Sequence, residues 1–157
     1  MKINGRIVKG PNYELVVIPR GNGDDNIVMK AMAVLSMDEF DKLCPTPTPP
    51  AKIKAGGEKE FNFQDKNYQL TMVRHGKQRL AWTIIESLRL GDNGIEWDKV
   101  KVDDCNTWEN WETDFRDAGF SNVEVQRVMA GVFAANCLNE AMIESARATF
   151  LRGTVAQ

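Results

Sequence analysis

The first 35 residues of the chain alternate apolar and polar side chains with a period of two, which is typical of β-strands. Short runs of β-branched and aromatic residues cover Arg6–Lys9, Tyr13–Ile18 and Asn26–Leu35, and turn-forming residues separate them. The connections are too short to hold crossover helices, so the pattern predicts a small antiparallel sheet of two or three strands. One face of the last strand is expected to collect the apolar residues Ile27, Met29, Ala31, Ala33 and Leu35.

From Asp65 onward the apolar residues recur at steps of three and four, which is the spacing of an amphipathic helix. Asp65 is a suitable N-cap for the first of these helices. Gly76 weakens the prediction of one unbroken helix, because an interior glycine costs about 1 kcal/mol relative to alanine. The segment Arg79–Leu90 is apolar on more than one side, so we expect it to be the central buried helix.

The remaining helices are recognised by their ends. Asn106–Glu109 and Ser121–Glu124 predict N-terminal caps, and Gly119 stands where a left-handed C-terminal cap belongs. Gly131 predicts a close contact between two helices. A last helix is predicted over Asn139–Arg152, and its expected buried stripe is Met142, Ala146, Phe150 and Leu151.

A stiff connector separates the β-rich part from the helical part. Ser36–Glu39 has the pattern of a capping box before a short helix over Met37–Leu43. Four prolines between positions 45 and 50 impose an extended polyproline II conformation, and the polar stretch 52–60 is expected to be a flexible loop. The predicted fold is α+β within one compact domain: a β-rich N-terminal part with a small antiparallel sheet at 1–44, a polyproline connector at 45–64 and a C-terminal helical bundle at 65–153.

Composition excludes several kinds of protein. With 157 residues, 43% of them hydrophobic and 27% charged, the chain is long enough for one domain with a real core. No apolar run approaches the ~18–20 residues that span a bilayer, and the first residues lack the apolar region of a secretory signal. We therefore expect no membrane partner.

Charge is distributed unevenly along the chain. The net charge is −2, but residues 1–80 hold 13 basic and 9 acidic side chains, whereas residues 81–157 hold 7 and 13. Such asymmetry is typical of a chain whose halves face different partners or each other. It disfavours a nucleic-acid binder that reads its target with the C-terminal half, because phosphate contacts need positive charge.

The residues that usually carry chemistry are few and scattered. Cys44, Cys105 and Cys137 are odd in number and widely spaced, which favours reduced thiols. A zinc site would need all three together with His75, with no local pair of ligands to start it. Nothing in the spacing pairs His75 with a nucleophile either. We therefore predict no enzyme activity, no catalytic residue, no metal ion and no cofactor.

One local pattern keeps a DNA-binding alternative open. A helix, a short turn around Gly119 and a second helix that opens at Ser121 have the sequence shape of a helix-turn-helix. The competing interpretation is an αα-hairpin that closes the core with aromatic residues, and the acidic charge of this half favours it. In a DNA-binding protein the second helix would offer Asn122, Glu124, Gln126 and Arg127.

Trp108 and Trp111 are the candidate interaction residues. They lie three positions apart on one side of the helix predicted after Asn106, and acidic residues surround them. We expect at least one indole to be partly exposed and to anchor a partner helix or another copy of the chain. Self-association therefore stays open.

Five stretches that cover much of the chain carry a family resemblance: Ile18–Pro50, Arg79–Leu88, Ile95–Val100, Asn106–Val128 and Ala135–Gly153. They resemble small proteins of tailed bacteriophages, the tail assembly chaperones. The resemblance implies a non-enzymatic viral protein that acts in the host cytoplasm and binds the tape-measure protein, tail-tube subunits or both. It implies no site residues, because the family has no catalytic set to carry over.

Two further kinds of phage protein would share these features. A virion structural component, such as a head–tail connector or a tail-completion protein, would use similar surfaces in permanent interfaces. An inhibitor of a host enzyme or defence complex would use an acidic face that mimics nucleic acid. Detection of the chain in purified virions separates the structural component from the chaperone, and an inhibitor would co-purify with a host protein.

Overall fold

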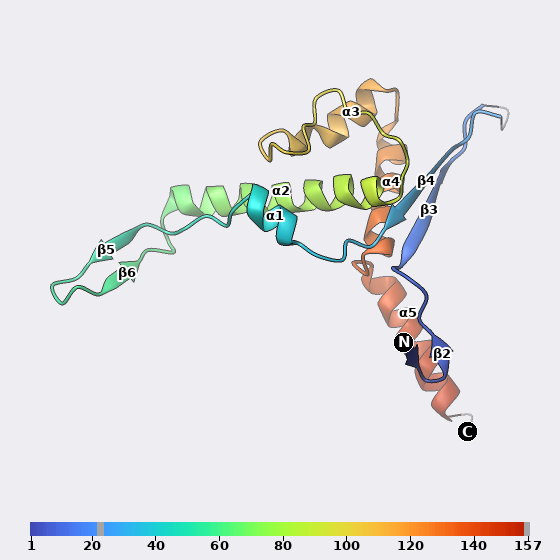
Figure 1. The fold of residues 1–157 in the computed structure, drawn as a ribbon, viewed down its shortest axis with the longest axis horizontal. Coiled ribbons are helices and arrows are strands. Elements are labelled where there is room, and N and C mark those ends of the chain that lie inside the picture. Colours follow the sequence, from blue (N-terminus) through green and yellow to red (C-terminus); the bar gives the residue numbers. More distant parts are fainter. Residues whose placement is uncertain (22–23, 156–157) are drawn as a thin grey trace. The chain divides into compact units, whose positions relative to one another are not determined.

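The computed structural model describes residues 1–21 and 24–155, and its fold is α+β, as the sequence predicts (Figure 1). The chain forms two compact units that interleave along the sequence. This division cuts across the linear order of β-rich part, connector and helical part. The hairpin unit consists of Met1–Leu35, Glu86–Glu96 and Phe115–Gln157, and the aromatic unit consists of Ser36–Ile85 and Trp97–Asp114.

Two antiparallel strand pairs form the β structure of the hairpin unit. The pairs are β1 (Lys2–Ile3) with β2 (Arg6–Ile7), and β3 (Tyr13–Ile18) with β4 (Ile27–Met32). Val16 lies opposite Met29, so even positions of β3 and odd positions of β4 share one face of the longer hairpin. The predicted antiparallel pairing is confirmed, but each described sheet has two strands, and β4 ends before Leu35.

Helix α4 (Asn122–Ala135) packs on the inner face of the β3–β4 hairpin. The closest approach is at Gly131, where a Cβ atom would lie 2.3 Å from Cγ2 of Val16. The close contact predicted at Gly131 therefore exists, but it joins a helix to a strand and not to a second helix. The buried apolar residues of this layer are Val16, Ile18, Met29 and Ala31 on the strands and Val125, Val128 and Val132 on α4.

The turn before α4 is closed by the predicted glycine. Helix α3 (Trp111–Asp117) is followed by Gly119, whose φ is +94°, a conformation that glycine adopts without steric cost. The N–H of Phe120 then donates to the carbonyl of Phe115 at 3.0 Å. This bond and the glycine conformation are those of a Schellman C-cap, which confirms the predicted stop.

Helix α5 (Glu140–Val155) differs from its prediction in burial. Its expected buried stripe is exposed, with Met142 53%, Phe150 64% and Leu151 55% accessible, and Ala146 is also exposed. The helix prediction is confirmed and the burial prediction is wrong. Helix α4 already occupies the inner face of the hairpin, where a second helix would have had to pack.

Helix α2 (Lys66–Leu90) begins in the aromatic unit and runs without a break. Asp65 Oδ1 accepts a hydrogen bond from the N–H of Tyr68 at 2.8 Å, which confirms the predicted N-cap. Gly76 lies at an exposed position with no neighbouring atom within 4 Å of its missing Cβ, so it does not interrupt the helix. The central segment is buried as predicted, through Ala81, Trp82, Ile84, Ile85 and Leu88.

The connector region holds more structure than the sequence predicts. Helix α1 (Asp38–Leu43) forms as expected, but a hairpin of β5 (Ala51–Ile53) and β6 (Lys59–Phe61) replaces the predicted flexible loop. Gly57, with φ +81°, donates its N–H to the carbonyl of Lys54 at 2.9 Å. The glycines that suggested flexibility therefore supply a tight turn.

Two predicted side-chain caps do not form. Ser36 Oγ accepts from the N–H of Asp38 at 3.1 Å, one residue too early for a capping box. The segment after Asn106 begins as a short 3₁₀ helix, η1 (Trp108–Asn110), without a side-chain cap. Thr107 Oγ1 instead accepts from the N–H of Lys101 at 2.8 Å. Ser36 therefore bonds a backbone N–H one residue nearer than a capping box requires, and Thr107 bonds the loop that precedes it.

Candidate protein-interaction surface

The outer face of the β3–β4 hairpin is apolar and exposed. Its four large apolar side chains are Tyr13, Leu15, Val17 and Val28, which are 54%, 53%, 45% and 57% accessible. Val17 and Val28 lie directly opposite each other in the pairing register. An exposed apolar patch on the outside of a sheet is a candidate site for contact with another molecule. We call this set of four residues the outer face.

The free edge of β4 is closed by side chains from the segment 86–96. Asn93 Oδ1 accepts from the N–H of Lys30 at 2.7 Å, and Asn93 Nδ2 donates to the Lys30 carbonyl at 2.9 Å. Ser87 Oγ donates to the carbonyl of Met32 at 2.6 Å. A Cβ atom on Gly91 would lie 1.7 Å from the Lys30 carbonyl oxygen, so only glycine fits this approach. A strand that paired along this edge would meet these side chains at Lys30 and Met32.

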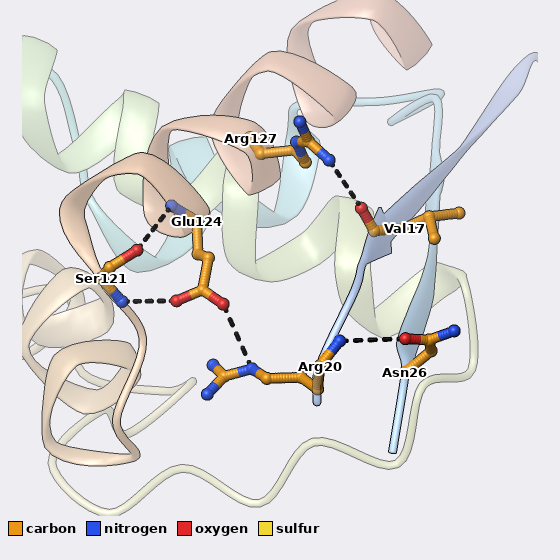
Figure 2. A network of polar contacts seen from close by, with 6 residues as sticks. All are labelled: Val17, Arg20, Asn26, Ser121, Glu124 and Arg127. Atoms are coloured by element: carbon orange, nitrogen blue, oxygen red, sulfur yellow. Dashed lines mark hydrogen bonds and ion pairs between the residues drawn. The ribbon is translucent and has the colours of Figure 1, made fainter. Parts of the chain in front are cut away.

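The free edge of β3 is open by comparison. The N–H of Ala33 donates to the carbonyl of Asn12 at 2.8 Å, which sets the phase of the ladder. In that phase the N–H and C=O groups of Tyr13, Leu15 and Val17 point away from β4. Among the described residues, this edge receives one hydrogen bond, from Arg127 Nη1 to the carbonyl of Val17 at 3.3 Å (Figure 2).

A groove runs between the open edge of β3 and helix α4. Its volume is about 360 Å³. The helix wall carries small side chains, so the space beside the strand is not filled. The groove is lined by Glu14, Leu15, Val16, Val17, Arg127, Ala130, Gly131 and Ala134. We call it the edge groove.

A polar network fixes the start of α4 beside the end of β3 (Figure 2). Ser121 and Glu124 form the predicted capping box, with the N–H of Ser121 2.7 Å from Glu124 Oε2 and the N–H of Glu124 3.3 Å from Ser121 Oγ. Arg20 Nε forms an ion pair with Glu124 Oε1 at 3.1 Å, without the geometry of a hydrogen bond. The bonds from Ser121 lower the pKa of Glu124, and Arg20 lowers it further.

Trp108 and Trp111 do not lie on this surface. Their side chains are 0% and 7% accessible, so the expectation that one indole is partly exposed is wrong. Trp108 packs against Phe40 and Trp82, with ring centroids 6.0 Å and 6.4 Å away. Its Nε1 donates to the carbonyl of Val102 at 3.1 Å, which satisfies the polar end of the ring inside the core. The physical basis for a partner anchor at these two residues is absent.

The thiols and the single histidine have structural surroundings. His75 Nε2 lies 3.1 Å from the carbonyl oxygen of Cys44 and its ring lies 5.2 Å from that of Phe40. Burial raises the pKa of Cys44 to about 12, with a further contribution from Cys105. Cys137 is exposed and belongs to the other unit. Across 1–21 and 24–155, no group of three metal-ligating side chains comes together.

Two of the four side chains that would contact DNA in the helix-turn-helix alternative are held by other contacts. Of the four side chains that α4 would present to DNA, Glu124 pairs with Arg20 and Arg127 donates to the carbonyl of Val17. Both contacts direct these side chains toward β3. The turn itself is present, but its second helix is a packing partner of the hairpin.

Comparisons with protein-family models, curated proteins and solved structures found no match to this chain. In the described part of the chain, no helix combines the length and the apolar character needed to cross a membrane.

Proposed function

We propose that this chain is a non-enzymatic tail assembly chaperone of a tailed bacteriophage, which binds the tape-measure protein, tail-tube subunits or both in the host cytoplasm. The resemblance of Ile18–Pro50 and Asn106–Val128 to that family motivates the assignment. The observation that carries it is the outer face of the β3–β4 hairpin, an exposed apolar surface on a unit whose inner face is already covered by α4.

This surface suits a protein that holds an apolar client. An assembly chaperone must offer apolar contact area to a long, sticky partner and must itself stay in solution. The outer face supplies the contact area through Leu15, Val17 and Val28, and Lys30 is half-buried beside them. Tyr13 adds an aromatic ring, over which the Lys30 ammonium lies at 4.5 Å.

The test is co-expression with the tape-measure protein of the same phage, followed by affinity capture. Val28→Glu places a charge in the outer face, and we expect it to abolish capture of the tape-measure protein. Val73→Glu is the matched control, because Val73 is 60% exposed on α2 in the other unit. Circular dichroism of both variants should match the unchanged chain.

Other outcomes would contradict the chaperone assignment. Recovery of the chain in stoichiometric amounts from purified virions would make it a structural component. Capture of one host enzyme or defence protein, with no binding of the tape-measure protein, would make it an inhibitor. Equal capture by Val28→Glu and the unchanged chain would remove the outer face as the client site.

A further inference from the structure

We propose that the edge groove binds an extended peptide segment of a partner protein, which adds to β3 as a third strand. This site shares Leu15 and Val17 with the outer face used in the proposed function, but it uses the edge of β3 and does not depend on the phage assignment. The two edges of the hairpin differ, because Asn93 and Ser87 bind the backbone along the free edge of β4.

An unpaired strand edge is normally protected, because its free N–H and C=O groups attract other strands. The chain protects β4 with Asn93 and Ser87, which replace the missing backbone partner at Lys30 and Met32. The same protection is absent from β3, where the outward N–H and C=O of Leu15 have no partner in the described chain. The two edges therefore differ at their centres, and the free N–H and C=O groups of Leu15 match those of an added strand.

The edge groove also defines which side chains the added strand carries. We infer an antiparallel orientation, which is slightly more stable per residue than a parallel one. The peptide residue opposite Leu15 then points to the outer face, and its two neighbours point into the groove, opposite Val16 and Glu14. The wall beside Val16 is formed by Ala130 and Gly131, so a medium-sized apolar side chain fits there.

The charged residues of the edge groove define which residues are expected at the two ends of the bound peptide. Glu14 and Arg127 line opposite ends of the groove, and neither has an ion-pair partner among the residues described. An antiparallel peptide places its N-terminal side near Arg127 and its C-terminal side near Glu14. The predicted ligand is therefore an extended segment that carries an acidic, an apolar and a basic residue, in that order from its N-terminal end. Residues of high β-propensity separate these three residues.

The probe is a blocked, fluorescently labelled peptide, Thr-Glu-Thr-Val-Thr-Lys-Thr, titrated with the full chain by fluorescence anisotropy. The reversed peptide, Thr-Lys-Thr-Val-Thr-Glu-Thr, has the same composition and places each charge against a like charge. We expect the reversed peptide to bind about tenfold more weakly. Binding of the two peptides with equal affinity, or of neither, would overturn the proposal.

Proline substitutions test the edge itself. Leu15→Pro removes an outward N–H that β4 does not use, so the hairpin should fold while peptide affinity falls by about tenfold or more. Met32→Pro is the matched control, because its N–H also points away from β3 on the protected strand; it should leave affinity unchanged. Equal loss in both variants would show that hairpin integrity, and not the β3 edge, controls binding.

Removal of the Arg127 charge tests the peptide register without a proline substitution. Arg127→Gln should weaken the peptide that carries glutamate by about fivefold, and should have no effect on a peptide with glutamine in that position. The same effect on both peptides would overturn the assigned register. Sedimentation of the chain alone tests whether a second copy of the chain occupies the groove. A dimer that dissociates in Leu15→Pro and that does not bind the peptide would assign the groove to that second copy.

Discussion

The ring cluster of the aromatic unit and the outer face of the hairpin unit place their apolar residues in opposite ways. In the aromatic unit, Phe40, Trp82 and Trp108 are buried against one another, with ring centroids 6.0–6.4 Å apart. In the hairpin unit the aliphatic residues Leu15 and Val17 stay about half exposed. Residue size and aromaticity therefore do not identify the surface that meets a partner in this chain. The difference is decided by which faces the topology covers.

The largest expected effect tests the buried side of this comparison. Trp108→Ala should reduce the free energy of unfolding by about 3–5 kcal/mol, because it empties a fully buried site between Phe40 and Trp82. Leu70→Ala is the control on the exposed surface of the same unit, where the side chain is 68% accessible. Urea unfolding followed by tryptophan fluorescence measures both. A loss below about 1 kcal/mol for Trp108→Ala would contradict the burial of this indole.

A substitution on the covered face of the hairpin should lower the free energy of unfolding nearly as much. Gly131→Ala should cost about 1–3 kcal/mol, because the new methyl group would meet Val16 and force α4 away from β3. Gly76→Ala is the matched control within a helix: its methyl group would have free space, so it should stabilise the chain by about 0.5–1 kcal/mol. Thermal unfolding distinguishes the two signs, and stabilisation by both variants would show that α4 does not approach the strand closely.

The cap of α4 tests how firmly the helix is held beside the hairpin. Ser121→Ala should cost about 1 kcal/mol, since it removes the hydroxyl that accepts the N–H of Glu124. The folded-state pKa of Glu124 is lowered, so its contribution is present at pH values above its unfolded pKa and is lost as pH falls through the folded pKa. The stability of Glu124→Gln should therefore fall less on acidification than that of the unchanged chain. Urea titrations at neutral and acidic pH would contradict this if the two curves stay parallel.

The smallest expected effect tests the exposed side. Leu15→Thr should change stability by no more than about 0.5 kcal/mol, because the side chain is already half in water. Val16→Thr, one position along on the covered face, should cost about 1–3 kcal/mol, since it buries a hydroxyl group. Similar losses for the two neighbours would mean that the outer face is covered in solution.

Local signals predicted most of the elements. Asp65, Gly119 and Ser121 each make the contact expected of a helix end, because a cap depends on only a few adjacent residues. The hairpin in the connector escaped prediction since its glycine pair is compatible with a turn and with a loop. The exposure of α5 escaped it as well, because an apolar stripe does not state which other element will cover it.

The candidate surface could be predicted only in part. The run Leu15–Ile18 is apolar on consecutive positions, which is a sign that both faces of the strand are apolar, and only one of them can meet α4. The protected edge of β4 depends on Asn93, which is 63 residues from its partner Lys30, and no local pattern reveals such a contact. The predicted exposure of Trp108 or Trp111 was wrong because a helix with acidic residues on its surface is also compatible with indoles that face the core.

The contact between Asn93 and Lys30 also limits how far association can proceed. A hairpin with two open edges can add strands on both sides, and repeated addition of that kind leads to fibrils. Here the side-chain amide of Asn93 binds both the backbone N–H and the backbone C=O of Lys30 at the edge of β4. If β3 accepts a strand as proposed, addition at β4 would be blocked at Lys30. Asn93 would then favour a finite complex over an extended polymer.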